Sequence, residues 1–145
     1  MDVLRIYFFC MATVMLFGPA LALAAPVVPV PDQIPGVTRV DAETVIDLAA
    51  KQPKLIIVDS RIAGDRKMGY IENSISLPDA KTNCKSLAKI IPTKTTPALF
   101  YCNGVKCGRS VVATRMALQC GYGNLYWFRG GFEEWRAKQY PYLTE

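Results

Sequence analysis

The apolar positions of the chain alternate between short continuous runs and segments with helical spacing. Continuous β-branched or aromatic runs are typical of strands covered on both faces, whereas apolar residues three or four apart indicate one buried face of a helix. Pro53, Pro78 and Pro92 separate successive elements, because proline continues neither a helix nor a sheet ladder. The pattern predicts strands over residues 36–40, 55–60, 74–77, 97–101 and 124–128, and helices over 42–51, 83–91, 110–120 and 130–138.

This alternation of strands and helices predicts the fold class. Strands that follow one another through helices favour an α/β domain with a mostly parallel central sheet. Asp41 stands directly before the first predicted helix and is a suitable N-cap. We therefore expect one domain over residues 36–145.

The first 35 residues follow a different pattern. An apolar run over residues 6–17 is broken by Gly18 and Pro19, and small residues precede a cut after Ala24. These features predict a signal peptide over residues 1–24 and a periplasmic or secreted protein. The alternative is an uncleaved membrane anchor over residues 6–25.

A proline-rich linker is expected next, over residues 25–35, which contain four prolines.

Composition narrows the chemistry. The chain has 145 residues, a formal net charge of +5, five cysteines and no histidine. The absence of histidine excludes a Ser-His-Asp triad, a Cys-His pair and any metal or haem site that needs histidine. The basic residues are scattered, so the charge does not predict nucleic-acid binding. We expect a monomer without metal or cofactor, in contact with a membrane only if the N-terminal segment is retained.

One cysteine stands where a predicted strand ends. Cys102 follows the strand over residues 97–101, and ligands of open parallel sheets bind beyond the carboxyl ends of strands. Gly104 and Gly108 allow the backbone N–H groups of the following loop to turn inward and bind an anion. The next helix directs its positive N-terminus to the same place, and Lys106 and Arg109 add two cations. The pattern favours a nucleophilic thiolate next to a negatively charged substrate.

Four segments, in order, resemble the rhodanese (thiosulfate sulfurtransferase-like) family. They are "LIIVDSR" (residues 55–61), "GYIENSISLP" (69–78), "LFYCNG…RS" (99–110) and "GYGNLYWFRGGFEEWRAKQYP" (121–141). The resemblance implies a three-layer α/β/α fold for residues 36–145.

It also implies a mechanism. The Cys102 thiolate would take the outer sulfur of thiosulfate or a related anionic donor, release sulfite and carry the sulfur as a persulfide. Cyanide or a thiol would then accept it. Asp59 and Arg61 are expected to support the neighbouring loops rather than to react. The expected substrate-binding residues are Asn103, Gly104, Val105, Lys106, Cys107, Gly108 and Arg109.

The loop departs from the family pattern. Six residues separate Cys102 from Arg109, two more than in the common C-x-x-G-x-R-S pattern and one more than in rhodanese-related phosphatases. Tyr70 also stands where the family commonly has histidine. Two alternatives therefore stay open: a phosphatase or arsenate-reductase-like enzyme that uses the same cysteine, and a non-catalytic sulfur or redox carrier.

The other cysteines allow several interpretations. Cys107 is a resolving thiol that attacks an oxidised or sulfur-loaded Cys102, a plain loop residue, or the partner of Cys102 in a stable disulfide that a thiol reductase must open. Cys84 and Cys120 are either buried small apolar residues or a structural pair.

Overall fold

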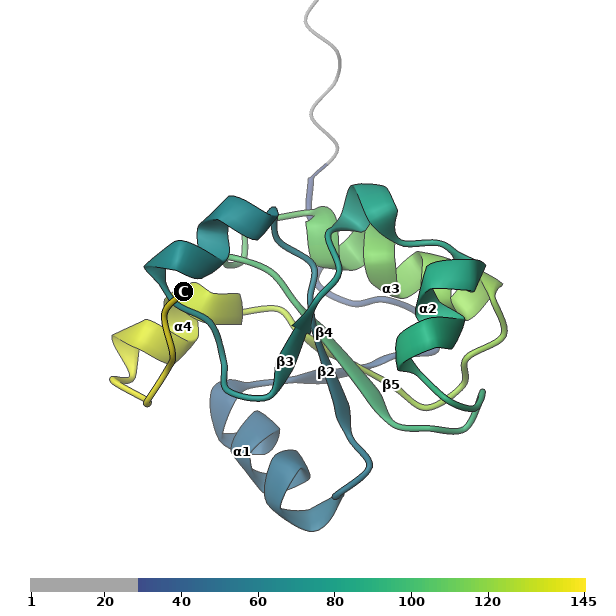
Figure 1. Ribbon diagram of the computed structural model, residues 1–145, viewed down its shortest axis with the longest axis horizontal. Coiled ribbons are helices and arrows are strands. Elements are labelled where there is room, and N and C mark those ends of the chain that lie inside the picture. The colour runs from purple at the N-terminus through teal and green to yellow at the C-terminus, as the bar shows by residue number, and fades with distance from the viewer. Residues whose placement is uncertain (1–28) are drawn as a thin grey trace, which may run out of the picture.

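Figure 1 shows the computed structural model of the protein, which describes residues 29–145 as a sheet with helices on both faces. The predicted signal peptide and the first part of the predicted linker lie outside the described residues. The strands are β1 (Thr38–Val40), β2 (Ile56–Asp59), β3 (Ser74–Ser76), β4 (Ala98–Tyr101) and β5 (Leu125–Phe128). The helices are α1 (Ala42–Lys51), α2 (Cys84–Ile90), α3 (Arg109–Gln119) and α4 (Gly131–Ala137).

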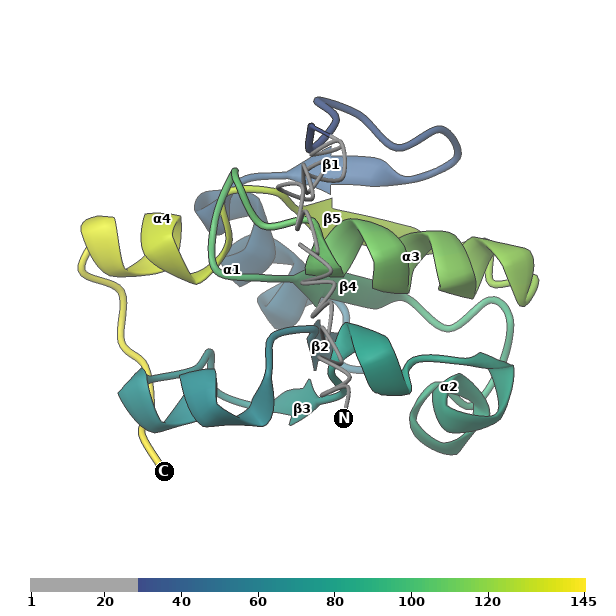
Figure 2. The same cartoon turned by 90° about the horizontal axis from the view of Figure 1, so that it is seen from above.

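The five strands lie in the order β1-β5-β4-β2-β3, and every neighbouring pair is parallel. The fold class is the predicted one, with a sheet that is parallel throughout. Figure 2 shows α1 and α4 on one side of the sheet and α2 and α3 on the other. These are the three layers that the resemblance implies.

The central strand β4 separates two hydrophobic clusters. Its Leu99 and Tyr101 point into the cluster that includes Phe132 and Trp135 of α4. Its Ala98 and Phe100 belong to the opposite cluster, which includes residues of α2 and α3. Because successive side chains of a strand point to opposite faces, a strand between two helical layers must be apolar at every position.

Two of the helices, α1 and α2, begin at a residue whose side chain caps them. The Asp41 carboxylate accepts from the Thr44 amide at 2.9 Å and caps α1, as predicted. Asn83 caps α2 in a reciprocal arrangement with Ser86. The predicted elements agree with the observed ones to within two residues at the strand and helix ends.

Two short 3₁₀ turns have no counterpart in the hydrophobic pattern. They are η1 (Ala63–Met68) and η2 (Asp79–Lys81), which follow β2 and β3. Their sequences, AGDRKM and DAK, are short and mostly polar, so they show no apolar spacing. Both lie at the edge of the sheet where the site is expected.

The described part of the predicted linker, residues 29–35, packs against the domain. Ile34 is buried with Val111 and Trp127, and Arg129 donates to the carbonyl of Pro31 at 3.0 Å. An ion pair of 3.2 Å between Arg129 and Asp32 adds a second contact. Among the described residues, no helix has both the length and the apolar character needed to cross a bilayer.

A disulfide joins Cys84, at the start of α2, to Cys120, directly after α3. The interpretation as a structural pair is therefore confirmed. The alternative of buried small residues is wrong, because Cys84 is exposed. The bond fastens the two helices that cover one face of the sheet.

We expect this disulfide to contribute substantially to stability. Replacing both cysteines by serine should lower the free energy of unfolding by roughly 4 kcal/mol, because the bond closes a segment of 36 residues in the unfolded chain. Urea denaturation monitored by circular dichroism measures the change. Replacing Cys107 alone, which opens a loop of 5 residues, should cost only about 2 kcal/mol. Equal losses in both variants would contradict this account.

Candidate functional site

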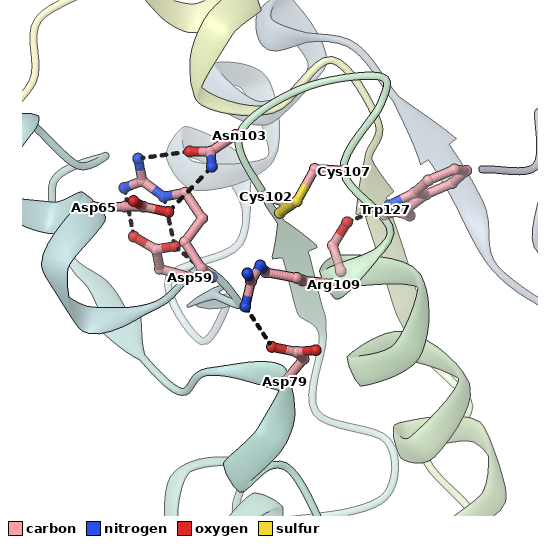
Figure 3. Close-up of a disulfide and its surroundings, with 10 residues drawn as sticks. Asp59, Asp65, Asp79, Cys102, Asn103, Cys107, Arg109 and Trp127 are labelled. Carbon is pink, nitrogen blue, oxygen red and sulfur yellow. Dashed lines mark hydrogen bonds and ion pairs between the residues drawn. A yellow bond between two sulfur atoms is a disulfide. The ribbon is translucent and has the colours of Figure 1, made fainter. Parts of the chain in front are cut away.

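The loop between β4 and α3 holds Cys102 at the carboxyl edge of the sheet (Figure 3). Cys102 is only 1% exposed and forms a disulfide with Cys107, with 6.1 Å between their Cα atoms. A turn brings the two together, since the Cys107 amide donates to the carbonyl of Gly104 at 2.9 Å. This bond excludes the interpretation of Cys107 as a plain loop residue, and it agrees with both a resolving thiol and a stable disulfide.

The amides of this loop remain available to an anion. Within residues 29–145, the N–H groups of Asn103 to Lys106 donate to no protein acceptor. Gly108 precedes α3 without a side chain that caps its first turn, so the first amides of that helix add to the same region. Amides without a protein acceptor next to a helix N-terminus are a common feature of anion-binding loops.

The two cations predicted at the loop, Lys106 and Arg109, have different surroundings. Lys106 and its neighbour Val105 are exposed. Arg109 forms an ion pair with Asp79 of η2, at 3.4 Å (Figure 3). Sequence reasoning missed Asp79 because it is 30 residues from Arg109. Part of the positive charge at the loop is therefore balanced by the protein itself.

A depression of about 590 Å³ lies at the root of the loop. Asn103 forms part of its wall, where its amide group donates to Asp65 of η1 at 3.1 Å. Arg61 donates to the side-chain amide oxygen of Asn103, Oδ1, at 3.5 Å. The remaining lining residues are Met68, Phe132, Glu133, Arg136 and Ala137. Positive and negative side chains alternate here, so the depression is not a purely cationic pocket.

Helix α4 holds the root of the loop in place. The amide of Phe132 donates to the carbonyl of Cys102 at 2.9 Å, and the amide of Glu133 donates to that of Asn103 at 2.7 Å. This approach requires Gly131, because its φ is +58° and a Cβ there would collide with the carbonyl oxygen of Cys102. The paired glycines at 130–131, conspicuous in the sequence, thus act through Gly131 on the candidate nucleophile.

Asp59 and Arg61 form a buried ion pair beside this root. Arg61 donates to both carboxylate oxygens of Asp59, at 2.9 and 2.7 Å. Tyr101 donates to the same carboxylate at 2.8 Å, and Arg66 contacts it at 3.3 Å. Arg61 also lies over the Phe132 ring of α4, 4.6 Å from its centroid. The pair thereby connects β2, β4 and α4 next to Cys102.

Two groups of this network, Arg61 and Tyr101, have raised pKa values. Burial lowers the pKa of Arg61, but the hydrogen bonds and charge of Asp59 outweigh this effect, so the pKa is raised above its ordinary value. Burial and the neighbouring Asp59 charge also raise the pKa of Tyr101. Both groups therefore keep their protons at neutral pH, and Asp59 accepts hydrogen bonds from both.

Tyr70 contacts Arg66 and Leu143. The Arg66 guanidinium stacks 3.7 Å from the centroid of its ring, and its backbone pairs with Leu143 of the C-terminal segment. These contacts connect the segment before β3 to the end of the chain.

The role of Gly131 can be tested with a matched pair of variants. Gly131→Ala should lower the free energy of unfolding by roughly 2–3 kcal/mol, because the alanine meets both a left-handed backbone and the Cys102 carbonyl. Gly123→Ala is the control, since nothing lies within 4 Å of a Cβ added there. Its effect should stay within about 0.5 kcal/mol. Urea denaturation gives both values, and a Gly131 variant as stable as the control would disprove the proposed constraint.

Comparisons with known proteins agree with this geometry. The model of the Rhodanese-like domain family matches residues 41–138. No curated protein gives a significant sequence match. Among solved structures, the BH2092 protein of Bacillus halodurans is 27% identical, with a TM-score of 0.65 over 74% of this chain and 77% of that one.

Two further solved structures have names that mention sulfur transfer. A thiosulfate sulfurtransferase of Pseudomonas aeruginosa is 24% identical with a TM-score of 0.65, over 74% of this chain and 20% of that one. The polysulfide-sulfur transferase homodimer of Wolinella succinogenes is 18% identical with a TM-score of 0.61, over 76% of this chain and 80% of that one. These likenesses support the shared fold. On the family match, the chain belongs to the rhodanese-like domain family.

Proposed function

We propose that the protein is a sulfurtransferase that moves a sulfane sulfur from thiosulfate or a related donor to a thiophilic acceptor through a persulfide on Cys102. The observation that carries the proposal is the position of Cys102 at the end of β4, within a loop whose amides 103–106 have no acceptor among the described residues. The sulfur-transferring relatives of the same fold favour this chemistry over other uses of the loop.

The reaction begins from the reduced protein, because the disulfide with Cys107 occupies the Cys102 sulfur. Once reduced, the Cys102 thiolate attacks the outer sulfur of thiosulfate, the S–S bond of the donor breaks, and sulfite leaves with the bond's electron pair. The free amides of residues 103–106 stabilise the negative charge on the persulfide. Cyanide or a thiolate then attacks the terminal sulfur and regenerates the Cys102 thiolate.

Arg109 and Lys106 have separate tasks in this proposal. Lys106 is exposed and attracts the anionic donor from solvent. Arg109 is held by Asp79, so it positions the loop and contributes less free charge. The longer loop leaves room for a donor or acceptor larger than thiosulfate.

Cys102→Ser tests the nucleophile. Under reducing conditions, thiocyanate formation from thiosulfate and cyanide should fall by at least about a thousandfold, because serine cannot form the persulfide. Val112→Ser is the control, because Val112 is 52% exposed on α3 and outside the loop. It should keep its activity.

Parallel assays with an aryl phosphate and with arsenate test the alternatives. Phosphate release or arsenate reduction that depends on Cys102, without thiocyanate, would instead identify an oxyanion-processing enzyme. Inactivity in all three assays would favour a non-catalytic sulfur or redox carrier.

We also propose that the protein acts in the periplasm or outside the cell, after cleavage of residues 1–24. The pairing of all four cysteines in residues 29–145 supports this location, because disulfides persist in oxidising compartments.

N-terminal sequencing of the protein recovered from the non-cytosolic fraction should start at Ala25. A protein that stays in the membrane fraction with its N-terminus intact would instead show that residues 6–25 anchor it.

A further inference from the structure

The Cys102–Cys107 bond differs from the other disulfide in what it connects. Cys84 and Cys120 are 36 residues apart and join two helices. Cys102 and Cys107 are 5 residues apart within a single loop, and a bond across so short a segment constrains the unfolded chain about half as strongly as the other bond. It also occupies the sulfur of Cys102, the proposed nucleophile. Stability alone is therefore a poor reason for this bond.

The fold directs Cys107 toward Cys102. The turn from Gly104 to Cys107 reverses the loop through a backbone hydrogen bond of 2.9 Å. The resulting Cα separation of 6.1 Å lies within the ordinary range for a disulfide. Since the loop is longer than the family pattern by two residues, the extra length provides the room for this turn and its second thiol.

The two cysteines differ in exposure in the disulfide form. Cys102 is only 1% exposed, whereas Cys107 is half-buried and follows the exposed residues Val105 and Lys106. Access decides which sulfur of a disulfide an incoming thiolate attacks. An external thiol therefore reaches Cys107, and Cys102 leaves as a thiolate into the loop whose amides stabilise negative charge.

We propose that Cys107 is a resolving thiol that takes the place of an external acceptor and converts the Cys102 persulfide into free sulfide. The Cys107 thiolate attacks the Cys102 sulfur, the bond between that sulfur and the sulfane sulfur breaks, and hydrosulfide leaves with the electron pair. The two cysteine sulfurs are oxidised to the disulfide and the sulfane sulfur is reduced by two electrons. This inference rests on the proposed sulfur transfer and names its acceptor.

A dithiol must restore the protein after each cycle. One thiolate of the dithiol attacks Cys107 and releases Cys102, and the second thiolate breaks the mixed disulfide. The sum is thiosulfate plus dithiol, giving sulfite, hydrosulfide, an oxidised dithiol and one proton. The partner is thus a protein or small molecule with two adjacent thiols. The disulfide in the structure is the oxidised form that this partner reduces.

A single turnover without an external acceptor tests the proposal. The full-length chain is reduced, freed of reductant under anaerobic conditions, and given one equivalent of thiosulfate. The wild type should release sulfite and sulfide in equal amounts. Cys107→Ser should release sulfite without sulfide and keep the sulfur on Cys102.

Peptide mapping identifies the product, because Lys106 lies between the two cysteines. After alkylation of free thiols, trypsin separates Thr95–Lys106 from Cys107–Arg109, and only the disulfide can hold these peptides together. The linked pair should appear in the wild type after thiosulfate and be absent without it. In Cys107→Ser, Thr95–Lys106 should carry one additional sulfur atom.

The outcomes separate the two proposals. Sulfite release with a stable persulfide and no sulfide in the wild type would overturn the internal acceptor while leaving the sulfurtransferase intact. No sulfite from either protein would overturn the sulfurtransferase itself. The double variant Cys84→Ser/Cys120→Ser is the matched control and should still release sulfide. Loss of sulfide release there, in a protein with a native circular dichroism spectrum, would assign the acceptor role to the other pair.

Discussion

The buried carboxylate of Asp59 organises the edge of the sheet on which the candidate site is built. It accepts hydrogen bonds from Arg61 and Tyr101, and Arg66 approaches it as well. A carboxylate in such a place is tolerated only when charged and hydrogen-bonding partners surround it. The partners come from β4 and from the segment after β2, so the requirement to satisfy one charge holds these elements together. Arg61 extends this order to Asn103 at the root of the loop.

The loop after β4 begins with residues that are held by hydrogen bonds and continues with backbone amides that have no acceptor among the described residues. Helix α4 binds the carbonyls of Cys102 and Asn103, and Gly131 allows the helix to approach that closely. Beyond this root, the amides of residues 103–106 find no acceptor among the described residues. Donors held in place before charge develops need little reorganisation during a reaction. In the proposed mechanism, the fixed start of the loop positions Cys102 and the amides of residues 103–106 are available to stabilise its persulfide.

The same loop contains Cys107, a second cysteine that forms a disulfide with Cys102. In the proposed mechanism, sulfur transfer to Cys102 ends in the Cys102–Cys107 disulfide, and each further cycle then depends on a supply of dithiol. An exported protein meets such dithiols only through dedicated reductants, because its surroundings favour disulfides. The proposed location, the proposed internal acceptor and the requirement for a reductant thus form one consistent account.

Much of the fold could be predicted from local patterns, because a buried parallel strand must be apolar on both faces and a capped helix shows its N-cap in the sequence. The continuous run at 97–101 and the cap at Asp41 are examples. The turns η1 and η2 were missed, since segments so short and polar contain too few apolar residues to show a period. The docking of residues 29–35 was missed as well, because it depends on Arg129, far along the chain.

For the site, the order of residues alone determined that Cys102 follows a buried strand and precedes a glycine-containing loop and a helix. It could not determine which partners reach that loop. The pairing of Arg109 with Asp79, the support of Asn103 by Arg61 and Asp65, and the contact of α4 with Cys102 join residues some 30 or more positions apart. Such contacts are decided by how the strands align in the sheet. Whether Cys107 reaches Cys102 was likewise decided by a backbone turn, because spacing brings two thiols near each other but only the folded loop brings their sulfurs into contact.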